Sequence, residues 1–402
     1  MKILVLNAGS SSIKYSLFDM LNHGVLIAGL IERIGETSSL HRYTLADSRQ
    51  LNCEKPIADH QHALRELFTT LSTSGILTDN SDLFCIGHRV VHGGEQFRQP
   101  ALIDEYVLQQ IAATVSLAPL HNPANLLGIK EAMRQMGEIP QIAVFDTAFH
   151  QTIPDYAYRY ALPTDLYSEH GVRRYGFHGT SHRYVAKLAA QFLGKALGET
   201  NLITLHLGNG SSVTAIENGQ SIDTSMGMTP LEGLIMGTRC GDIDPAIVFY
   251  LSRTMNMSVD AIENLLNKNS GCKGICGEND MRAIHKLAEA GDAAARLTLN
   301  MYAYRIIKYI GAYFAVLNRV DALVFTGGIG ENDAWLREKC CSQLSALGIA
   351  IDIAKNQSPS HPCADIGAGD AAVAVLVIAT NEELEIAIQA RECLENRVSA
   401  NK

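Results

Sequence analysis

The sequence predicts an α/β protein of two domains, and three observations support this. The chain has 402 residues, which is more than a single hydrophobic core accommodates. Short runs of β-branched residues and leucine alternate with helical patterns along its length. A ten-residue motif near the N-terminus also recurs half a chain length later. We therefore expect two domains, each of which begins with one copy of this motif.

Eight segments have the apolar composition of strands. The clearest helix is expected to start near Asp292, a possible N-cap residue, and carries apolar side chains at helical spacing at Ile306, Ile310, Tyr313 and Leu317. The expected strands are Ile3–Leu6, Ser12–Phe18, Ile86–Val91, Gln141–Phe145, Leu202–Leu207, Ser212–Ile216, Ala322–Thr326 and Ala372–Ile378.

The repeated motif comprises Leu4–Ile13 and Leu205–Thr214. Each copy predicts a strand, a tight turn of Gly, Ser and Asn, and a second strand. Chance or a shared turn preference could produce so short a match, but its position at half the chain length favours duplication. Two such hairpins facing each other would clamp the phosphates of a nucleotide, because oriented backbone N–H groups bind anions.

A third glycine-rich segment, Gly327–Asn332, follows the expected strand Ala322–Thr326. We expect a turn there, whose glycines allow the backbone to approach a flat ligand such as adenosine. Taken alone, this pattern is a weak signal, since it lacks the spacing of a dinucleotide-binding or Walker motif.

Composition excludes several classes of function. A net charge of −9 argues against a nucleic-acid partner, because binding to phosphate backbones requires a basic surface. The longest apolar run, Ala371–Ala379, is about half of the ~20 residues that a membrane span needs. The N-terminal apolar run breaks at Asn7 and is expected to be a strand instead of a signal peptide. We expect a cytoplasmic protein without a membrane partner.

The cysteines are expected to be free thiols. Their odd number and scattered positions are typical of a reducing compartment. Cys272 and Cys276 have the spacing of half a metal site, but no second Cys/His pair accompanies them. The nine cysteines are Cys53, Cys85, Cys240, Cys272, Cys276, Cys340, Cys341, Cys363 and Cys393.

Two arginines lie among glycines, and this predicts either of two roles. Arg89 lies within Gly87–Gly94 and Arg239 within Met236–Pro245. Such an arginine either pairs with a nearby Asp or binds a carboxylate or phosphate. Asp146 ends an apolar strand, where α/β proteins place ligand contacts, or else caps the next turn.

The segment Arg173–His182 contains two arginines and two histidines among glycines, and this composition favours a ligand-binding loop. His178 could donate a hydrogen bond to a phosphoryl group in transfer. His182 is expected to be structural, at the entrance to a helix over Arg183–Leu193.

Four long, collinear motifs resemble those of the acetate/propionate kinase family. They are Asn7–Lys14, Gly171–His182, His206–Gly210 and Phe325–Asn332. The resemblance extends from end to end and implies the fold shared by acetate and sugar kinases, Hsp70 and actin. This fold has two duplicated ribonuclease-H-like domains around a nucleotide cleft, and such proteins are usually homodimers. We expect an N-terminal acid-kinase domain at 1–148 plus 383–402 and a nucleotide-binding domain at 149–382.

The resemblance also implies an activity, the reversible phosphorylation of acetate by ATP to give acetyl phosphate and ADP. Direct in-line transfer with Mg²⁺ is expected, with Mn²⁺ able to substitute. One alternative is a propionate or other short-chain fatty acid kinase. Another is a non-enzymatic nucleotide clamp like Hsp70 or actin, but such a clamp would lack Arg89, Arg239 and His178.

Site residues follow from the same resemblance, motif by motif. Asn7 and Glu382 would hold Mg²⁺, and Lys14 would contact ATP. The remaining nucleotide-binding residues would be His206, Leu207, Gly208, Asn209 and Gly210 at the phosphates, and Asp280, Met281, Arg282, Gly328, Ile329, Gly330, Glu331 and Asn332 around the adenosine.

The resemblance assigns binding of the substrate carboxylate to Arg89. Arg239 and His178 would stabilise the transferring phosphoryl group, as such a transition state requires cations around its oxygens. Asp146 would lie at the acceptor end. It would not be needed as a general base, because acetate is already ionised at pH 7. Asp146 would instead orient Arg89 or Arg239.

Four residues match the positions that enclose the methyl group of acetate in this family: Val91, Leu120, Phe177 and Pro230. Valine at position 91 favours acetate, because the propionate kinases tend to have a smaller residue there. One methylene changes binding by only about 1–3 kcal/mol, so propionate should be a weaker substrate. The chain departs mildly from the family pattern at Cys240, Ala379 and Gly271–Gly274.

Overall fold

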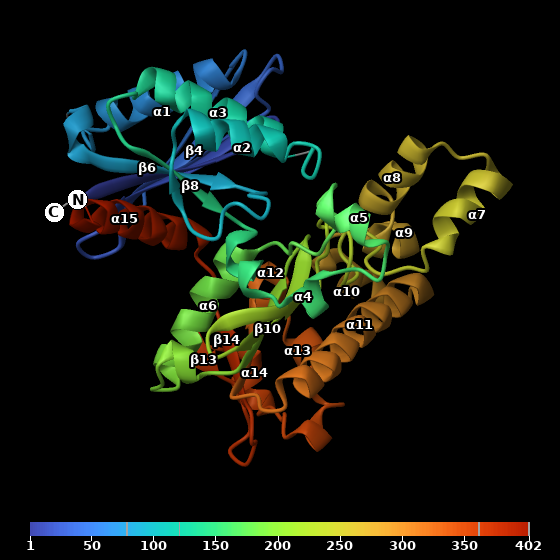
Figure 1. The fold of residues 1–402 in the computed structure, drawn as a ribbon. Coiled ribbons are helices and arrows are strands. Elements are labelled where there is room, and N and C mark those ends of the chain that lie inside the picture. The colour runs from blue at the N-terminus through green and yellow to red at the C-terminus, as the bar shows by residue number, and fades with distance from the viewer. Residues whose placement is uncertain (78, 120, 361, 401–402) are drawn as a thin grey trace. The chain divides into compact units, whose positions relative to one another are not determined.

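The chain forms two compact units, which a computed structural model describes over residues 1–77, 79–119, 121–360 and 362–400. Unit 1 comprises Met1–Ala148 together with Asn381–Lys402, and unit 2 comprises Phe149–Thr380. The C-terminal helix, red in Figure 1, packs on the sheet formed by the blue and cyan N-terminal strands. Both ends of the chain therefore belong to the same unit.

Unit 1 contains an eight-stranded sheet in the order β5-β4-β3-β2-β1-β6-β8-β7. Its strands are β1 (Lys2–Ala8), β2 (Ser12–Asp19), β3 (Gly24–Glu32), β4 (Ser39–Leu45), β5 (Gln50–Lys55), β6 (Leu83–Val90), β7 (Ala101–Leu102) and β8 (Gln141–Phe145). Its helices are α1 (His60–Thr73), α2 (Glu105–Ala113), α3 (Asn122–Gln135) and α15 (Glu382–Ala400).

Unit 2 contains a six-stranded sheet in the order β11-β10-β9-β12-β14-β13. Its strands are β9 (Leu202–Leu207), β10 (Ser211–Glu217), β11 (Gln220–Thr224), β12 (Ala322–Thr326), β13 (Cys363–Asp365) and β14 (Ala374–Ile378). Its helices are α4 (Asp155–Tyr158), α5 (Thr164–Ser168), α6 (Gly179–Phe192), α7 (Ala246–Met255), α8 (Val259–Lys268), α9 (Gly271–Cys276), α10 (Met281–Glu289), α11 (Ala293–Leu317), α12 (Gly327–Asn332), α13 (Ala334–Cys341) and α14 (Ile353–Gln357).

The two sheets share one topology. In unit 1, β1 pairs antiparallel with β2 and parallel with β6, and β6 pairs parallel with β8. In unit 2, β9 pairs antiparallel with β10 and parallel with β12, and β12 pairs parallel with β14. Each copy of the repeated sequence motif is thus a β-hairpin whose first strand is the central strand of its sheet.

Alternating side chains bury both faces of the unit 1 sheet. On one face, Leu4 and Leu6 of β1 join the core formed with α1. On the other face, Ile3 and Val5 pack with Ile386 of α15. A strand that is covered on both faces consists of consecutive apolar residues, and this explains why all four residues of Ile3–Leu6 are apolar.

The long helix α11 confirms the expectation at Asp292, whose side chain accepts a hydrogen bond from the N–H of Ala295. The expectation of a turn over Gly327–Asn332 is wrong, because these residues form the short helix α12. Gly327 enters it with a φ of 77°, and a Cβ there would lie 2.7 Å from the carbonyl oxygen of Leu207. Glycine is required at this position for both reasons.

Smaller differences concern element boundaries. Helix α6 begins at Gly179, one turn before the expected Arg183, and β14 begins at Ala374. All nine cysteines are free thiols. Within the described residues, no helix has both the length and the apolar composition for crossing a membrane.

Candidate active site

In unit 1, Arg89 and Asp146 form an ion pair at the ends of adjacent parallel strands. Arg89 lies near the end of β6, and Asp146 follows β8 directly. The Nη2 of Arg89 donates to Oδ2 of Asp146 over 2.6 Å, and its Nε donates to the same oxygen over 3.0 Å. Burial opposes the charge of Arg89, but Asp146 and Glu382 outweigh it and raise the pKa of the guanidinium. Arg89 therefore remains charged and is held in one orientation by Asp146.

Glu382, the first residue of α15, lies in the same charged group. Burial is the main cause that raises its pKa to about 7, and the charges of Asp146 and Glu383 add to the effect, while Arg89 and Lys14 oppose it. Lys14 of β2 pairs with Glu383. Lys14 also lies opposite Asn7 in the β1–β2 hairpin. Asn7, Lys14 and Glu382, which the family resemblance assigns to Mg²⁺ and ATP, therefore lie in or beside one cluster of charged side chains.

Helix α3 connects the hairpin to the segment that follows Arg89. The side chain of Asn125 donates from Nδ2 to the carbonyl oxygen of Ala8 over 2.8 Å, and its Oδ1 accepts from the N–H of Val91 over 3.1 Å. Asn125 is almost fully buried. It therefore fixes the distance between the Asn7 strand and the Arg89 strand.

In unit 2, His178 is fixed by a chain of hydrogen bonds. It is the N-cap residue of α6 and has a left-handed φ of 57°, which is uncommon for a residue other than glycine. Its Nδ1 lies 2.9 Å from Oγ of Ser212, which in turn lies 2.7 Å from Nε2 of His182. A hydroxyl has one hydrogen, so at least one of these two ring nitrogens donates to Ser212.

His182 is buried and structural, as expected. Burial lowers its pKa well below the usual value, and the neighbouring His150 and His206 lower it further. Its Nδ1 bonds Oγ1 of Thr204 over 2.7 Å. His182 therefore stays neutral near pH 7 and supports His178 through Ser212.

Gly210, in the turn of the second hairpin, lies against both His178 and Arg239. A Cβ at this position would lie 3.4 Å from Nε2 of His178 and 3.6 Å from Nη1 of Arg239. His206 stacks on His178 with a centroid distance of 4.3 Å. The residues that we expected at the phosphates and at the transferring group therefore meet around one glycine turn.

Arg239 contrasts with Arg89, because the interactions of its guanidinium are with neutral groups. Its Nη1 donates to the carbonyl oxygen of Pro230 over 3.0 Å and contacts the sulfur of Met236. Among the described residues no carboxylate lies within ion-pair distance of Arg239. Burial lowers its pKa. A partly buried cation balanced by no neighbouring carboxylate favours an anionic ligand.

A cavity of about 960 Å³ lies beside this turn, within unit 2. It is within the range of small-molecule binding sites. Eight of the predicted nucleotide-binding residues line it, from the second hairpin, the start of α10 and α12. They are Gly208, Asn209, Asp280, Met281, Arg282, Gly328, Ile329 and Asn332, with Asn332 at the end of α12.

Other predicted nucleotide-binding residues face elsewhere. Leu207 is fully buried in the core. The Oε1 of Glu331 accepts from the backbone N–H groups of Gly327 and Thr380. The carbonyl oxygen of Gly330 accepts from Nη1 of the buried Arg337 over 2.9 Å. These residues shape α12 and its surroundings and do not line the cavity.

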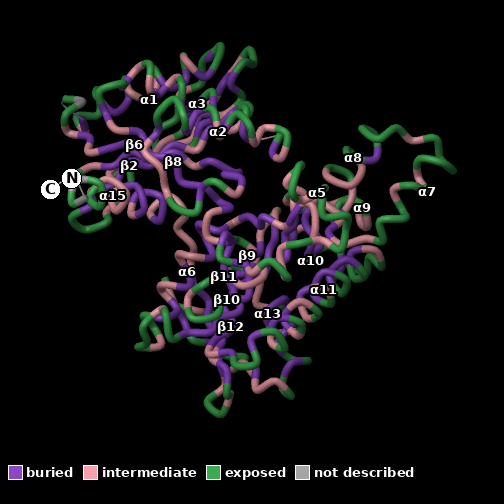
Figure 2. Tube along the Cα trace, viewed as in Figure 1, coloured by how far each residue is buried: buried purple, intermediate pink, exposed green. Residues whose placement is uncertain are grey.

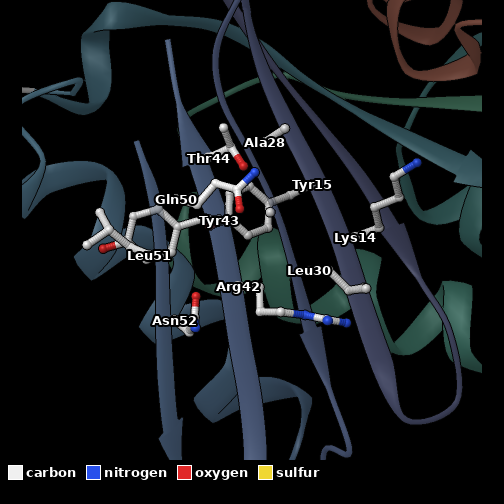
Figure 3. A pocket seen from close by; sticks show the side chains of 11 residues that line it. Lys14, Tyr15, Ala28, Leu30, Arg42, Tyr43, Thr44, Gln50, Leu51 and Asn52 are labelled. Atoms are coloured by element: carbon white, nitrogen blue, oxygen red, sulfur yellow. The ribbon is translucent and has the colours of Figure 1, made fainter. Parts of the chain in front are cut away.

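A second hollow, of about 320 Å³, lies on the unit 1 sheet (Figure 3). Lys14, Leu30, Arg42 and Asn52 form one row across β2, β3, β4 and β5. The charges at this hollow are already neutralised, because Lys14 pairs with Glu383 and Arg42 with Glu32. We assign no ligand to it.

Three of the four residues predicted around the methyl group are divided between the two units. Val91 belongs to unit 1 and Phe177 and Pro230 to unit 2. Leu120 lies outside the described residues. The acid-binding pocket therefore stays a prediction.

The sequence analysis missed several residues at these sites. Asn125, Ser212 and Ser181 hold the site through hydrogen bonds, and Ser181 links His206 to Thr380 over 2.8 Å on each side. Trp335 and His285 line the cavity. Ser181 and Ser212 lie within the motifs described above, which is a usable signal. Trp335 lies three residues after the Gly327–Asn332 segment predicted to approach adenosine, and this proximity was its only signal.

Comparison with known proteins supplies the context for these sites. The sequence model described as the Acetokinase family matches residues 2–388. The chain belongs to the acetokinase family. A curated acetate kinase of Helicobacter pylori (strain Shi470) is 53% identical and aligns over 98% of this chain and 99% of its own length.

Solved structures of the family confirm the predicted fold. An acetate kinase of Porphyromonas gingivalis matches with a TM-score of 0.93 at 43% identity, covering 98% of this chain and 99% of its own. A propionate kinase of Francisella tularensis matches with a TM-score of 0.92 at 44% identity, covering 96% and 98%. This acetokinase chain thus has the two-domain fold of acetate and sugar kinases, Hsp70 and actin, and similarity at this level does not separate acetate from propionate.

Proposed function

We propose that the chain is an acetate kinase, which transfers the γ-phosphoryl group of ATP reversibly to acetate and gives acetyl phosphate and ADP. Membership of the acetokinase family supports the reaction class. The observation that carries the mechanism is Arg239, a partly buried cation without a carboxylate partner beside the Gly210 turn. A metaphosphate-like transition state would place negative charge beside the Arg239 guanidinium, which has no carboxylate partner of its own.

The proposal divides the reaction between the two units. Unit 1 would be the acid-kinase domain, in which Asp146 orients Arg89 and Arg89 binds the acetate carboxylate through its remaining donors. Because acetate is ionised at pH 7, Asp146 acts on Arg89 and takes no proton from the substrate.

Unit 2 would be the nucleotide-binding domain. Backbone N–H groups of the His206–Gly210 turn would bind the phosphates, and the adenosine would enter the 960 Å³ cavity. His178, held by Ser212, and Arg239 would stabilise charge on the three equatorial oxygens during direct in-line transfer.

The residues proposed for Mg²⁺ fit this ion. Asn7 offers an amide oxygen and Glu382 a carboxylate, and Mg²⁺ in kinases uses one or two such groups with waters and substrate phosphates. Burial, and to a smaller extent the carboxylates of Asp146 and Glu383, raise the pKa of Glu382, and a divalent cation would offset the repulsion among these carboxylates. When bound, Mg²⁺ would neutralise charge on the β- and γ-phosphates. We expect chelation by EDTA to abolish activity and either Mg²⁺ or Mn²⁺ to restore it.

The identity of the acid is tested by a substrate series. We expect kcat/KM to fall from acetate to propionate to butyrate, because Val91 would narrow the pocket. A Val91→Ala variant should shift the ratio toward propionate by about 5-fold to 100-fold, as expected for one methylene. Propionate exceeding acetate in the wild-type protein would instead establish a propionate kinase.

A homodimer in the cytoplasm completes the proposal. Helix α7 has no buried residue, and Phe249, Tyr250 and Met255 are each about 60% exposed, as the green tube of α7 in Figure 2 indicates. Exposed apolar groups of this size favour coverage by a second copy. Light scattering should give the mass of two chains, and Phe249→Glu should reduce it to one.

A further inference from the structure

Trp335 lines the nucleotide cavity beside His285 of α10. The cavity follows one face of α10, because Met281, His285 and Glu289 are spaced by four residues and all line it. This row extends about 12 Å at 1.5 Å per residue. Its start adjoins the turn, since Asn279 contacts Asn209 over 3.5 Å. Trp335 accompanies His285 toward the other end.

The Trp335 side chain is held in place but left partly open. Its indole meets the His285 ring edge to face at a centroid distance of 5.3 Å. The Nε2 of His285 is fixed by Oδ2 of Asp333 over 2.8 Å, and Oδ1 of Asp333 accepts from the N–H of Leu336. Trp335 nevertheless remains 39% exposed. A large aromatic ring held firmly at a cavity wall, instead of being buried in the core, is suited to contact a planar ligand.

The charges at this end of the cavity exclude phosphate. Both oxygens of Asp333 are occupied, one by Nε2 of His285 and the other by the N–H of Leu336. Glu289 adds a negative charge. This wall therefore suits an uncharged, flat group better than an anion.

We propose that Trp335 is a nucleotide-specificity residue that packs against the base, with His285 and Asp333 as the positioning residues that hold its indole. This inference rests on the proposed function. The glycine segments would contact the nucleotide through their backbone, whereas Trp335 would recognise the base through its side chain.

The single tryptophan of the chain allows a direct test. Binding of ADP or adenosine should change the Trp335 fluorescence with saturation, whereas inorganic tripolyphosphate, which lacks a base, should leave it unchanged. Calorimetry measures ADP binding independently of the fluorescence. Trp335→Leu should raise the Kd of ADP and the KM of ATP about tenfold, in line with loss of base stacking, while kcat and the KM of acetate stay unchanged.

Matched variants separate this role from a structural one. Trp335→Phe should retain most of the affinity for ADP, and Phe192→Leu, an exposed aromatic residue at the end of α6, should have no effect. His285→Leu should weaken ADP binding and broaden the Trp335 fluorescence spectrum. His285→Gln keeps a donor toward Asp333, so it should restore part of the ADP affinity and part of the original spectrum. Two results would overturn the inference and leave the proposed kinase intact. One is ADP binding that calorimetry detects but that does not change the Trp335 fluorescence. The other is a Trp335→Leu variant that binds ADP with full affinity. Absence of ADP binding to the wild-type protein would overturn both.

Discussion

Arg89 in unit 1 and Arg239 in unit 2 are both arginines set among glycines, yet the structure treats their charges differently. Arg89 makes a two-nitrogen contact with the carboxylate of Asp146, which is 1% exposed. Arg239 has the carbonyl oxygen of Pro230 and the sulfur of Met236 as its partners. Asp146 thus fixes the direction of Arg89 and offsets part of its charge, whereas Arg239 keeps its full charge for a ligand. On our proposal, the same local sequence context serves ground-state binding in one unit and transition-state stabilisation in the other.

The largest effect is expected for Arg239→Ala. Loss of a preorganised charge at the transferring group should lower kcat by about 10²-fold to 10³-fold. The melting temperature should stay the same or rise, because a partly buried cation without a carboxylate partner has been removed. Hydroxamate formation from acetate and ATP measures the activity, and thermal unfolding measures the stability. Near-normal activity would remove Arg239 from the mechanism.

Arg89→Ala should differ by losing stability as well as activity. It removes the Arg89 partner of the buried carboxylate of Asp146, which should reduce the free energy of unfolding by about 3 kcal/mol. A strong loss in kcat/KM for acetate should accompany it. The double variant Arg89→Met with Asp146→Asn should recover much of the stability and none of the activity. Equal destabilisation by Arg89→Ala and Arg239→Ala in urea would contradict the distinction between the two arginines.

A smaller effect is expected for Ser212→Ala, which removes the hydroxyl between His178 and His182. The His178 ring would lose its fixed orientation, and a small misplacement of a catalytic group costs up to about 100-fold in rate. We expect kcat to fall by about tenfold with little change in the KM of acetate. Ser212→Thr, which retains the hydroxyl, should recover part of the rate. A change in KM alone would assign Ser212 to substrate binding.

The smallest effect concerns pH and the His285–Asp333 pair. The hydrogen bond to Asp333 raises the pKa of His285 in the folded protein above its value in the unfolded chain. The stabilisation is therefore complete below the unfolded pKa of about 6.5 and disappears as pH rises through the folded pKa. Asp333→Asn should lower the melting temperature more at pH 5.5 than at pH 9. An equal difference at both pH values would mean that the pair contributes no charge interaction.

Much of the fold could be predicted from local sequence. The apolar runs predicted the central strands, and Asp292 predicted the start of α11, because strand burial and helix capping depend on neighbouring residues. The segment Gly327–Asn332 was mistaken for a turn. Its helix depends on tertiary contacts, since Glu331 accepts from Gly327 and Arg337 binds the carbonyl oxygens of Gly330 and Glu331.

The amino-acid sequence alone shows which chemical groups are available: two hairpins with glycine turns, two arginines among glycines, and a histidine-rich loop. Only the tertiary structure decided how each group is used. Asp146 and Arg89 are 57 residues apart, and His178 and Ser212 are 34 apart, so no local pattern reveals that they pair. Parallel strands and helix packing bring such residues together, and these long-range contacts decide that one arginine is neutralised while the other remains available.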